Sequence, residues 1–439
     1  MQLAKKLRAV DYFALGFGAM VGVGWLVVMD DWLERGGPLG AILGFALCGA
    51  ALLPIGYVYG RLAGAMPDAG SEIAYTAQFG DRVSFAAGWM MMLAYLVVCP
   101  WEAIAIGKIA SYLVPSLSTI ELYQVAGKPV YLPHLVAGIG LTAWITLVNY
   151  RGIRWSARFQ NVTTFSVIAL FAVACLSALG KGSVANMKPA FSGGAVVSTL
   201  LVLQVVPYFM TGFEAVPKCA EEASPGFGRR GFFLAIFCAL GVGVLFYTLA
   251  VAVVSSLTPW QSLLHTPFAT AVAFERALSA RWIVDILLAA ALLSLLKVFN
   301  GNFLAASRLL FALGRRGLAT PRLAWIHPKN QTPAVAVAVV GAVTVAFAPL
   351  GQAVLIPIAE VGSFACTLGW LAACVAWLRM GKGVRERAIA VTGILVATAL
   401  SLIKLIPCVP GHFSKWEWIA LAAWALVGLA IHRKRPAAA

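Results

Sequence analysis

Two long apolar segments of this chain are interrupted by glycine near their centres. Residues 16–25 read GFGAMVGVGW, and residues 207–214 read PYFMTGFE. Glycine weakens a helix by roughly 1 kcal/mol relative to alanine, and proline removes a backbone hydrogen bond. Unwound backbone at membrane depth is tolerated only where protein or a water-filled cavity covers it. A matched pair of breaks therefore indicates a ligand site near the bilayer midplane, whereas either segment alone fits close helix packing through small residues equally well.

The composition places the whole chain in a membrane. Hydrophobic residues make up 61% of the 439 residues and charged residues only 11%, far from the values of soluble proteins. We predict one all-α transmembrane domain over residues 1–439, without a cleavable signal peptide or a soluble domain. About twelve membrane-spanning helices are expected, at residues 12–29, 38–62, 84–112, 132–150, 161–179, 197–220, 232–255, 283–313, 332–349, 353–377, 388–406 and 416–432.

The net charge of +16 follows the predicted topology. Alternate connections between the spans hold 22 lysines and arginines on one side and only 8 on the other. The positive-inside rule then places both termini in the cytoplasm, and we expect a bacterial inner (plasma) membrane. This distribution indicates contact with anionic membrane lipids and argues against nucleic-acid binding. The eight on the sparse side are Arg35, Lys128, Lys181, Lys188, Arg276, Arg281, Lys404 and Lys415.

The positions of the two breaks predict an internal repeat. Each break opens a group of five spans, over about residues 12–179 and 197–377, and two extra helices follow at about 388–432. Two shorter helices are expected in the connections. Residues 71–76 are amphipathic and suit the cytoplasmic surface, and residues 258–280 are predicted to contain an external helix over the pathway.

Four segments resemble the amino acid–polyamine–organocation transporter superfamily. They are 18–24 (GAMVGVG), 63–75 (AGAMPDAGSEIAY) with Gly88-Trp89, 212–215 (GFEA) with Glu221-Glu222, and 307–333, which carries Gly314-Arg315-Arg316-Gly317. The resemblance implies the five-plus-five inverted repeat of the LeuT-type fold with helices 1 and 6 broken. It also implies alternating access and the import or exchange of amino acids or amines. Val23 and Trp25 depart from the small or hydroxyl residues usual at the first break, so the substrate stays open.

The ends of a broken helix expose polar backbone groups. Amides at Gly22, Val23 and Gly24 would favour a carboxylate, because helix N-termini carry partial positive charge. Carbonyls near Ala19, Met20, Phe209 and Met210 would favour an ammonium group. In the second break, Tyr208 and Phe209 are candidates to cap a substrate by cation–π contact, next to Thr211 and Gly212. Kinking for packing and ordinary aromatic contact are the alternatives.

Three ionisable residues inside apolar segments are candidates for gating or proton coupling. Glu102 is predicted to bind an amine or a proton, and the alternative is a structural hydrogen bond. Glu214 is a candidate gate contact or proton carrier. In sodium-coupled relatives of the fold the eighth span supplies a sodium ligand, so the Lys297 ammonium is a candidate replacement for that cation, or else a plain ion-pair partner. The eighth span lacks a cluster of hydroxyl residues, which favours protons or no ion over sodium.

Two function classes stay open at the sequence level. The first is a secondary transporter of amino acids or organic amines, coupled to protons or working by exchange. The second is a sensor that keeps the transporter fold and binds such a ligand without net transport. An enzyme is not expected, because the chain has no HExxH motif, no nucleophile elbow and only five histidines. No cofactor and no metal site are expected, and the protein is predicted to be a monomer or a homodimer.

Overall fold

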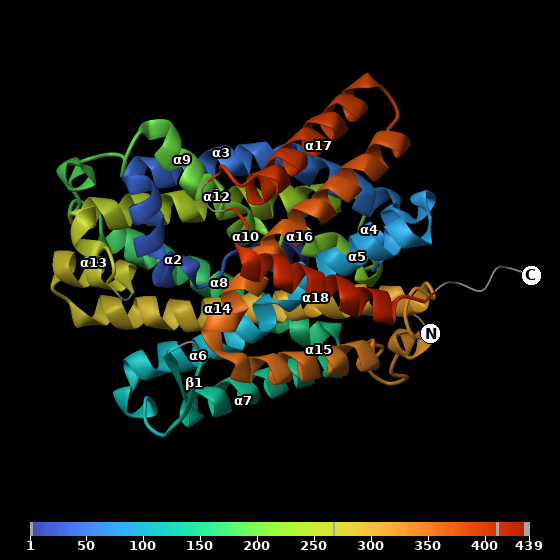
Figure 1. Cartoon of the computed structure of the whole chain (residues 1–439), viewed down its shortest axis with the longest axis horizontal. Coiled ribbons are helices and arrows are strands. Elements are labelled where there is room, and N and C mark those ends of the chain that lie inside the picture. Colours follow the sequence, from blue (N-terminus) through green and yellow to red (C-terminus); the bar gives the residue numbers. More distant parts are fainter. Residues whose placement is uncertain (1–2, 126, 267, 410–411, 434–439) are drawn as a thin grey trace, which may run out of the picture.

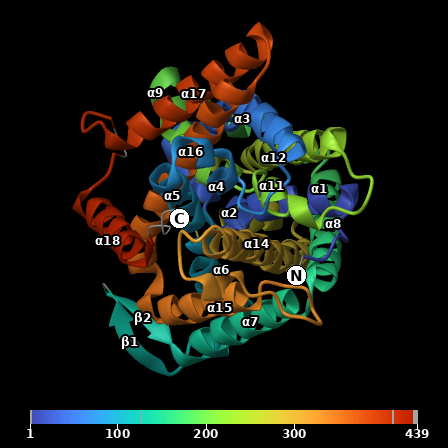
Figure 2. The same ribbon diagram turned by 90° about the vertical axis from the view of Figure 1, so that its right-hand side faces the viewer.

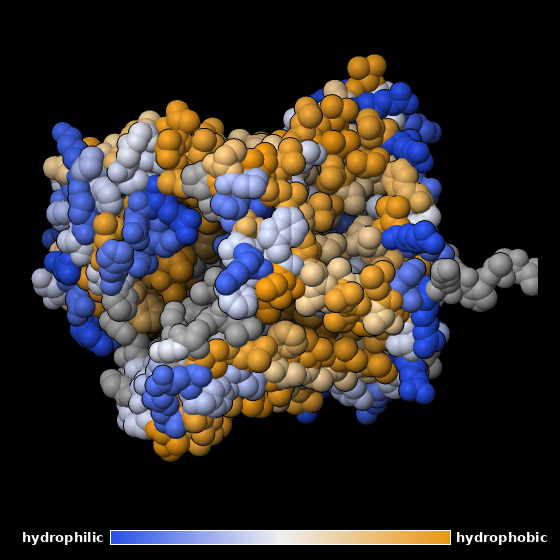
Figure 3. Space-filling view, in the orientation of Figure 1, coloured by the Kyte–Doolittle hydropathy of each residue, from blue (hydrophilic) through white to orange (hydrophobic). Residues whose placement is uncertain are grey.

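The computed structural model describes residues 3–125, 127–266, 268–409 and 412–433, and helices account for most of them (Figure 1). Among these residues, nine helices are long and apolar enough to cross a membrane. Hydrophobic side chains cover the middle of the face in Figure 3, and hydrophilic ones gather mainly toward its two ends. The chain is therefore an all-α membrane protein.

The first half of the chain, up to residue 177, contains eight helices and one hairpin. They are α1 (Ala9–Met20), α2 (Gly24–Val27), α3 (Met29–Ala65), α4 (Glu72–Tyr75), α5 (Asp81–Leu96), α6 (Val98–Leu113), β1 (Glu121–Val125), β2 (Lys128–Tyr131), α7 (Leu132–Arg151) and α8 (Ile153–Ser177).

The second half contains ten helices. They are α9 (Ala195–Leu203), α10 (Val206–Met210), α11 (Ala215–Lys218), α12 (Arg229–Leu257), α13 (Ala269–Leu278), α14 (Arg281–Arg315), α15 (Ala334–Phe347), α16 (Gly351–Met380), α17 (Val384–Leu405) and α18 (Lys415–Ile431).

Three of the twelve expected spans are not among the nine long helices. Residues 197–220 are divided between α9, α10 and α11, while α15 and α18 have only 14 and 17 residues. The number twelve stays a prediction. The helix expected within 258–280 is present as α13, and its Thr270 hydroxyl donates to the Trp25 carbonyl of α2 at 2.6 Å. Its external location stays a prediction.

Other local expectations need correction. The segment at 71–76 forms α4, but Glu72 to Tyr75 are all buried, so α4 does not lie on the surface. An antiparallel hairpin, β1 with β2, stands in the connection before α7, where no strand was predicted. Arg308, included in the sequence count of loop charges, is fully buried within α14.

Helix α14 occupies the centre of the bundle. It packs against α1, α5, α6 and α8, and Figure 2 shows it surrounded by the other long helices. A kink at Gly37 divides α3, where φ is 62° and a Cβ atom would lie 2.7 Å from the backbone of Phe191 and Ser192. Only glycine fits this conformation and this close approach. The kink lets the second half of α3 start at Pro38, as predicted.

The chain start and the end of α18 lie at the same end of the molecule, while α13 and the hairpin lie at the opposite end (Figure 1). The backbone amide of Arg433 donates to the carbonyl of Leu318 at 3.0 Å, which ties the end of α18 to the connection after α14. The charge count likewise assigns the two termini to one side, and the connections that contain the hairpin and α13 to the other. Which end faces the cytoplasm stays a prediction.

Candidate functional site

The first chain break separates α1 from α2. Helix α1 ends at Met20, and α2 begins at Gly24. Among the described residues, the Val23 amide has no hydrogen-bond acceptor, while the Gly22 amide interacts with the hydroxyl oxygen of Tyr247. A buried amide without a partner is rare in folded proteins, so the Val23 amide at the start of α2 is suited to an anionic partner.

Side chains from α12 and α14 hold the carbonyl groups of this break. Asn302 donates to the Ala19 carbonyl at 3.1 Å, and Tyr247 donates to the Met20 carbonyl at 3.1 Å. The Ser294 hydroxyl lies within hydrogen-bond distance of the carbonyls of Val21 at 3.1 Å and Gly22 at 2.9 Å. The carbonyls of Ala19 and Met20, which were expected to face an ammonium group, therefore each accept a hydrogen bond from the protein.

The second break crosses the first one directly. Helix α10 ends at Met210, α11 begins at Ala215, and Gly212 between them has a φ of 141°. A Cβ atom on Gly212 would lie 2.5 Å from the Met20 amide nitrogen, so only glycine allows this contact. The structure thus brings together the two segments that the sequence singled out, although they are nearly 200 residues apart.

Aromatic side chains close one side of the first break. The ring of Phe209 lies over Gly24, where a Cβ atom would approach it to 2.5 Å. Phe209 packs edge-on against Trp32 and Tyr247, at centroid distances of 4.9 and 6.0 Å. Tyr208 is half-buried and forms an edge contact with Phe209 at 5.3 Å. Phe209 therefore belongs to an aromatic cluster. Such a cluster is compatible both with capping of a substrate and with ordinary aromatic packing.

The polar groups of the second break are satisfied mainly within the protein. Thr211 donates to the Pro207 carbonyl at 2.9 Å and to Cys366 at 3.1 Å. Cys366 donates in turn to Oε1 of Glu214 at 3.2 Å, and Oε2 of Glu214 accepts from the Gly212 amide at 3.1 Å. Met210 is fully buried. Glu214 thus holds the backbone of the second break at Gly212.

Glu102 faces the first break from α6. A Cβ atom on Gly22 would lie 3.8 Å from Oε1 of Glu102. Only 4% of Glu102 is exposed, and its Oε2 has no hydrogen-bond partner among the described residues. An unpaired buried carboxylate oxygen is costly unless a ligand or a proton satisfies it. Glu102 is therefore the strongest candidate for contact with a cationic group.

Lys297 approaches the same break from α14. Its side chain is fully buried, and its ammonium group donates to the carbonyl of Val21 and to that of Gly18, the latter at 3.5 Å. The ammonium also lies 5.4 Å from the ring centroid of Phe17 and interacts electrostatically with Glu102. The structure thus places the Lys297 amino group against the unwound end of α1.

A buried polar cluster lies beside the second break, where α3, α4 and α11 meet. Lys218 donates to Oε1 of Glu72 at 2.8 Å and to the Glu214 carbonyl at 3.0 Å. The Tyr59 hydroxyl donates to the same carboxylate oxygen at 2.5 Å. Both charged side chains are fully buried. This cluster ties the second broken segment to the connection after α3.

Two further layers of ion pairs lie toward the end of the molecule at which the chain starts. Arg308 of α14 forms a bidentate pair with Glu222, at 2.7 and 3.1 Å, with both side chains fully buried. Arg315 binds Glu221 at 2.5 Å and Asp68 at 3.0 Å nearer the surface. Figure 2 looks onto this end, with α4, α11 and α14 near its centre. These two ion pairs and the Glu72–Lys218 cluster together form three polar layers in this part of the bundle.

Several residues of this site were not predicted from the sequence. Ser294, Asn302 and Tyr247 are single polar residues in apolar helices, and what they bind depends on how the helices pack. Glu72 and Lys218 carry a detectable signal, since both are charges next to apolar segments. Their pairing joins residues 146 positions apart, which no local pattern reveals.

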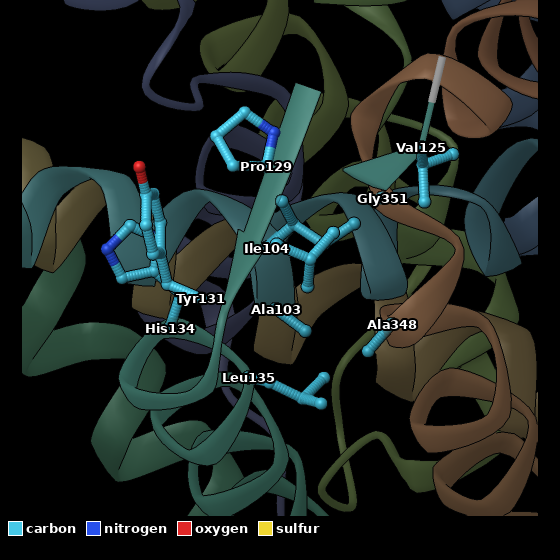
Figure 4. A pocket seen from close by; sticks show the side chains of 10 residues that line it. Ala103, Ile104, Val125, Pro129, Tyr131, His134, Leu135, Ala348 and Gly351 are labelled. Carbon is cyan, nitrogen blue, oxygen red and sulfur yellow. The ribbon is translucent and has the colours of Figure 1, made fainter. Parts of the chain in front are cut away.

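A small separate cavity lies between the hairpin, α6 and α7 (Figure 4). Its volume is about 70 Å³, and Tyr131 and His134 line one side of it. Ala103 and Ile104 also line it, directly after Glu102 in the sequence. Within the described part of the chain, none of the predicted binding residues lines this cavity.

The sequence also resembles those of known proteins. The sequence model of a family described as "Amino acid permease" matches residues 7–431. The chain is 26% identical to a branched-chain amino acid permease of Bacillus subtilis, over 98% of this chain and 92% of that protein. It is also 26% identical to a methylthioribose transporter of Bacillus subtilis, over 75% of this chain and 72% of that protein. A vacuolar cationic amino acid transporter of Arabidopsis thaliana is 28% identical, over 79% of this chain and 58% of its own length.

Proposed function

Since the chain belongs to the amino acid permease family of the amino acid–polyamine–organocation superfamily, we propose that it is a secondary transporter of amino acids or organic amines. Transport would proceed by alternating access around the two chain breaks. The family makes the protein a transporter and not an enzyme, and the three named relatives are transporters too. They give the sensor hypothesis no support.

One arrangement carries the proposal for the substrate class. The Val23 amide, which has no acceptor among the described residues, suits a carboxylate, and the unpaired Oε2 of Glu102 suits an ammonium group close to Gly22. An α-amino acid presents these two charges a short distance apart. An amine without a carboxylate would use Glu102 alone. The aromatic pair Tyr208 and Phe209 would then cover the bound ligand.

We also propose the finer architecture that the family implies. The contact of Gly212 with the backbone of Ala19 and Met20 supports two inverted five-span repeats of the LeuT type, followed by α17 and α18. A bacterial inner membrane with both termini in the cytoplasm fits the charge count. The three ion-pair layers around Glu72, Glu222 and Asp68 would then close the cytoplasmic side in this conformation.

Coupling to protons, or exchange without an ion, is favoured over coupling to sodium. The Lys297 ammonium already contacts the carbonyls of Val21 and Gly18, and a second cation at this place would meet its charge. Glu102 and Glu214 are the other candidate proton carriers. No resident cofactor or metal is part of the proposal.

The test is uptake of labelled amino acids and amines into vesicles that contain the purified protein. Glu102→Gln keeps the size of the side chain and removes its charge. Affinity for amine-bearing substrates should fall about tenfold or more, since a hydrogen bond to a charged group contributes roughly 1.5–3 kcal/mol. Glu121→Gln in the exposed hairpin is the matched control and should change nothing.

Two outcomes would contradict the proposal. Ligand binding without any uptake by the parent protein would favour the sensor. An equal loss of affinity for neutral and cationic ligands in Glu102→Gln would give Glu102 a structural role.

A further inference from the structure

A ridge of glycines on α3 brings α12 into close contact at the end of the molecule where the chain starts. A Cβ atom on Gly64 would lie 2.8 Å from Cα of Arg229, and one on Gly60 would lie 3.1 Å from Cα of Phe233. The first turns of α12 therefore rest directly on the α3 backbone. Side chains next to this contact surround a cavity.

This cavity has a volume of 370 Å³ and lies between α3, α12 and α16. Three arginines and three aromatic residues line it, together with small residues of α3. They are Arg61, Arg229, Arg230, Tyr57, Phe233 and Trp377.

The cavity carries an excess of positive charge. Arg61 forms an ion pair with Glu386, and its guanidinium lies 5.9 Å from the Tyr57 ring and 5.7 Å from the Trp377 ring. Nε of Arg229 donates to the Gly64 carbonyl at 3.1 Å, so its remaining N–H groups stay available. Arg230 forms no ion pair or hydrogen bond with the residues described. Three guanidinium groups thus meet one carboxylate.

The cavity opens beside a lipid-facing surface. On α12, Arg230 is followed at helical spacing by the exposed apolar residues Leu234, Cys238 and Leu245, and Leu234 and Leu245 are 49% and 56% exposed. Helix α12 is one of the nine helices that can cross a membrane. A row of this kind suits an acyl chain, and the arginines stand where the headgroup layer would lie.

We propose that this arginine cavity binds the phosphate headgroup of an anionic phospholipid. Guanidinium groups bind phosphate oxygens in bidentate fashion, which makes a phosphate-bearing anion the ligand. Free phosphate has the same chemistry. The apolar row and the aromatic rim favour the lipid as its source, since tyrosine and tryptophan gather at membrane interfaces. This site does not depend on the proposed transport function.

The experiment is native mass spectrometry of the purified full chain in a non-ionic detergent, titrated with dioleoylphosphatidylglycerol or dioleoylphosphatidylcholine. The anionic phosphatidylglycerol should bind about tenfold more tightly than the zwitterionic phosphatidylcholine. The double variant R229Q/R230Q should lose most of that preference. The control R154Q/R158Q removes the same charge from exposed positions on α8 and should keep it.

Three results would overturn the proposal. They are equal binding of both lipids, an equal loss of the preference for phosphatidylglycerol in both double variants, and displacement of phosphatidylglycerol by millimolar inorganic phosphate. The last result would identify a site for the free anion. If R229Q/R230Q does not fold, the single variant R230Q decides the question, because the Arg230 side chain has no ion pair or hydrogen bond within the described part of the chain to lose.

Discussion

Gly22 is the residue at which the unwound backbone meets a carboxylate and an apolar wall. A Cβ atom there would lie 3.4 Å from Val298 and 3.8 Å from Glu102, which are ordinary contact distances. Alanine therefore fits at this position, whereas a longer side chain would occupy the space between the break and α6. Comparing alanine with leucine at this position therefore distinguishes loss of space for a ligand from loss of the backbone freedom that glycine provides.

We predict that Gly22→Leu abolishes substrate binding and leaves a folded protein, while Gly22→Ala retains most of the affinity. The leucine side chain would fill the place of the ligand, and the single methyl group would not. Binding is measured by ligand-induced thermal stabilisation, since a ligand that binds only the folded state raises its stability. Unchanged affinity in Gly22→Leu would mean that the break only serves packing.

Lys297 leads to a prediction about coupling. Its ammonium joins α14 to the carbonyls of Val21 and Gly18, and loss of the proton would release this contact. Uptake should therefore not require sodium and should vary with pH. Lys297→Met should keep some substrate binding and lose the pH dependence, whereas Lys181→Met at an exposed position should behave as the parent protein.

The result that would reject this role is a strict sodium requirement in the parent protein, or normal pH-dependent uptake by Lys297→Met. Glu102 is the charged residue of α6 that interacts with Lys297, so it would then be the better proton carrier, with Glu214 as the other candidate.

Sequence could identify some of these residues and not others. Glu102 and Lys297 stand out because charges are rare in apolar helices, and Gly22 because it interrupts one. Ser294 and Asn302 give no such signal, since small polar residues are common in membrane helices. Their contacts with α1 arise from the packing of α14 against the break, which a linear pattern does not contain.

The fully buried pair of Glu222 and Arg308 joins two elements, η4 (Ala220–Glu222) and α14. We predict that Arg308→Met lowers the free energy of unfolding by about 3–5 kcal/mol, because it leaves Glu222 buried without a partner. The double variant Arg308→Met/Glu222→Leu should recover much of this loss. Thermal unfolding of the purified variants measures both effects.

Arg281→Met provides the comparison for a surface pair. Arg281 is 64% exposed and lies 3.8 Å from Glu275 and Asp285, so its removal should change stability by less than about 1 kcal/mol. A loss of stability in Arg308→Met as small as that in Arg281→Met would show that the buried pair contributes little to stability.

Elements with a strong local pattern were predicted well. Helix α13 was expected between two spans and is present. The part of α3 after the kink at Gly37 begins at Pro38, where a span was expected to begin. Helix α4 was expected at the surface because its sequence is amphipathic. It is buried because its polar residue Glu72 finds Lys218 and Tyr59 inside the protein.

The whole molecule has two distinct ends, which leads to a prediction of topology. Reporter fusions at Arg35, Lys188 and Lys415 should report an external location, and fusions at Arg154 and Arg385 an internal one. The physical reason is the positive-inside rule, applied to connections that the fold groups at opposite ends. Reversed signals at most of these positions would reject the orientation.

At this scale the membrane class and the family followed from composition and motifs, while the ion pairs at the end where the chain starts did not. Its ion pairs link residues 86 to 247 positions apart, such as Arg308 with Glu222 and Arg315 with Asp68. A single sequence contains no record of such distant contacts. Arg308 was consequently grouped with the loop charges although it is buried.

The first break is attached to the rest of the protein through its main chain. Ser294, Asn302 and Tyr247 bind carbonyl oxygens, and every amino acid supplies the same carbonyl. Side chains between Ala19 and Gly22 can therefore change without loss of these attachments, within the space that Gly212 and Val298 leave. A chain segment held in this way can be altered in evolution one side chain at a time while its framework is inherited intact.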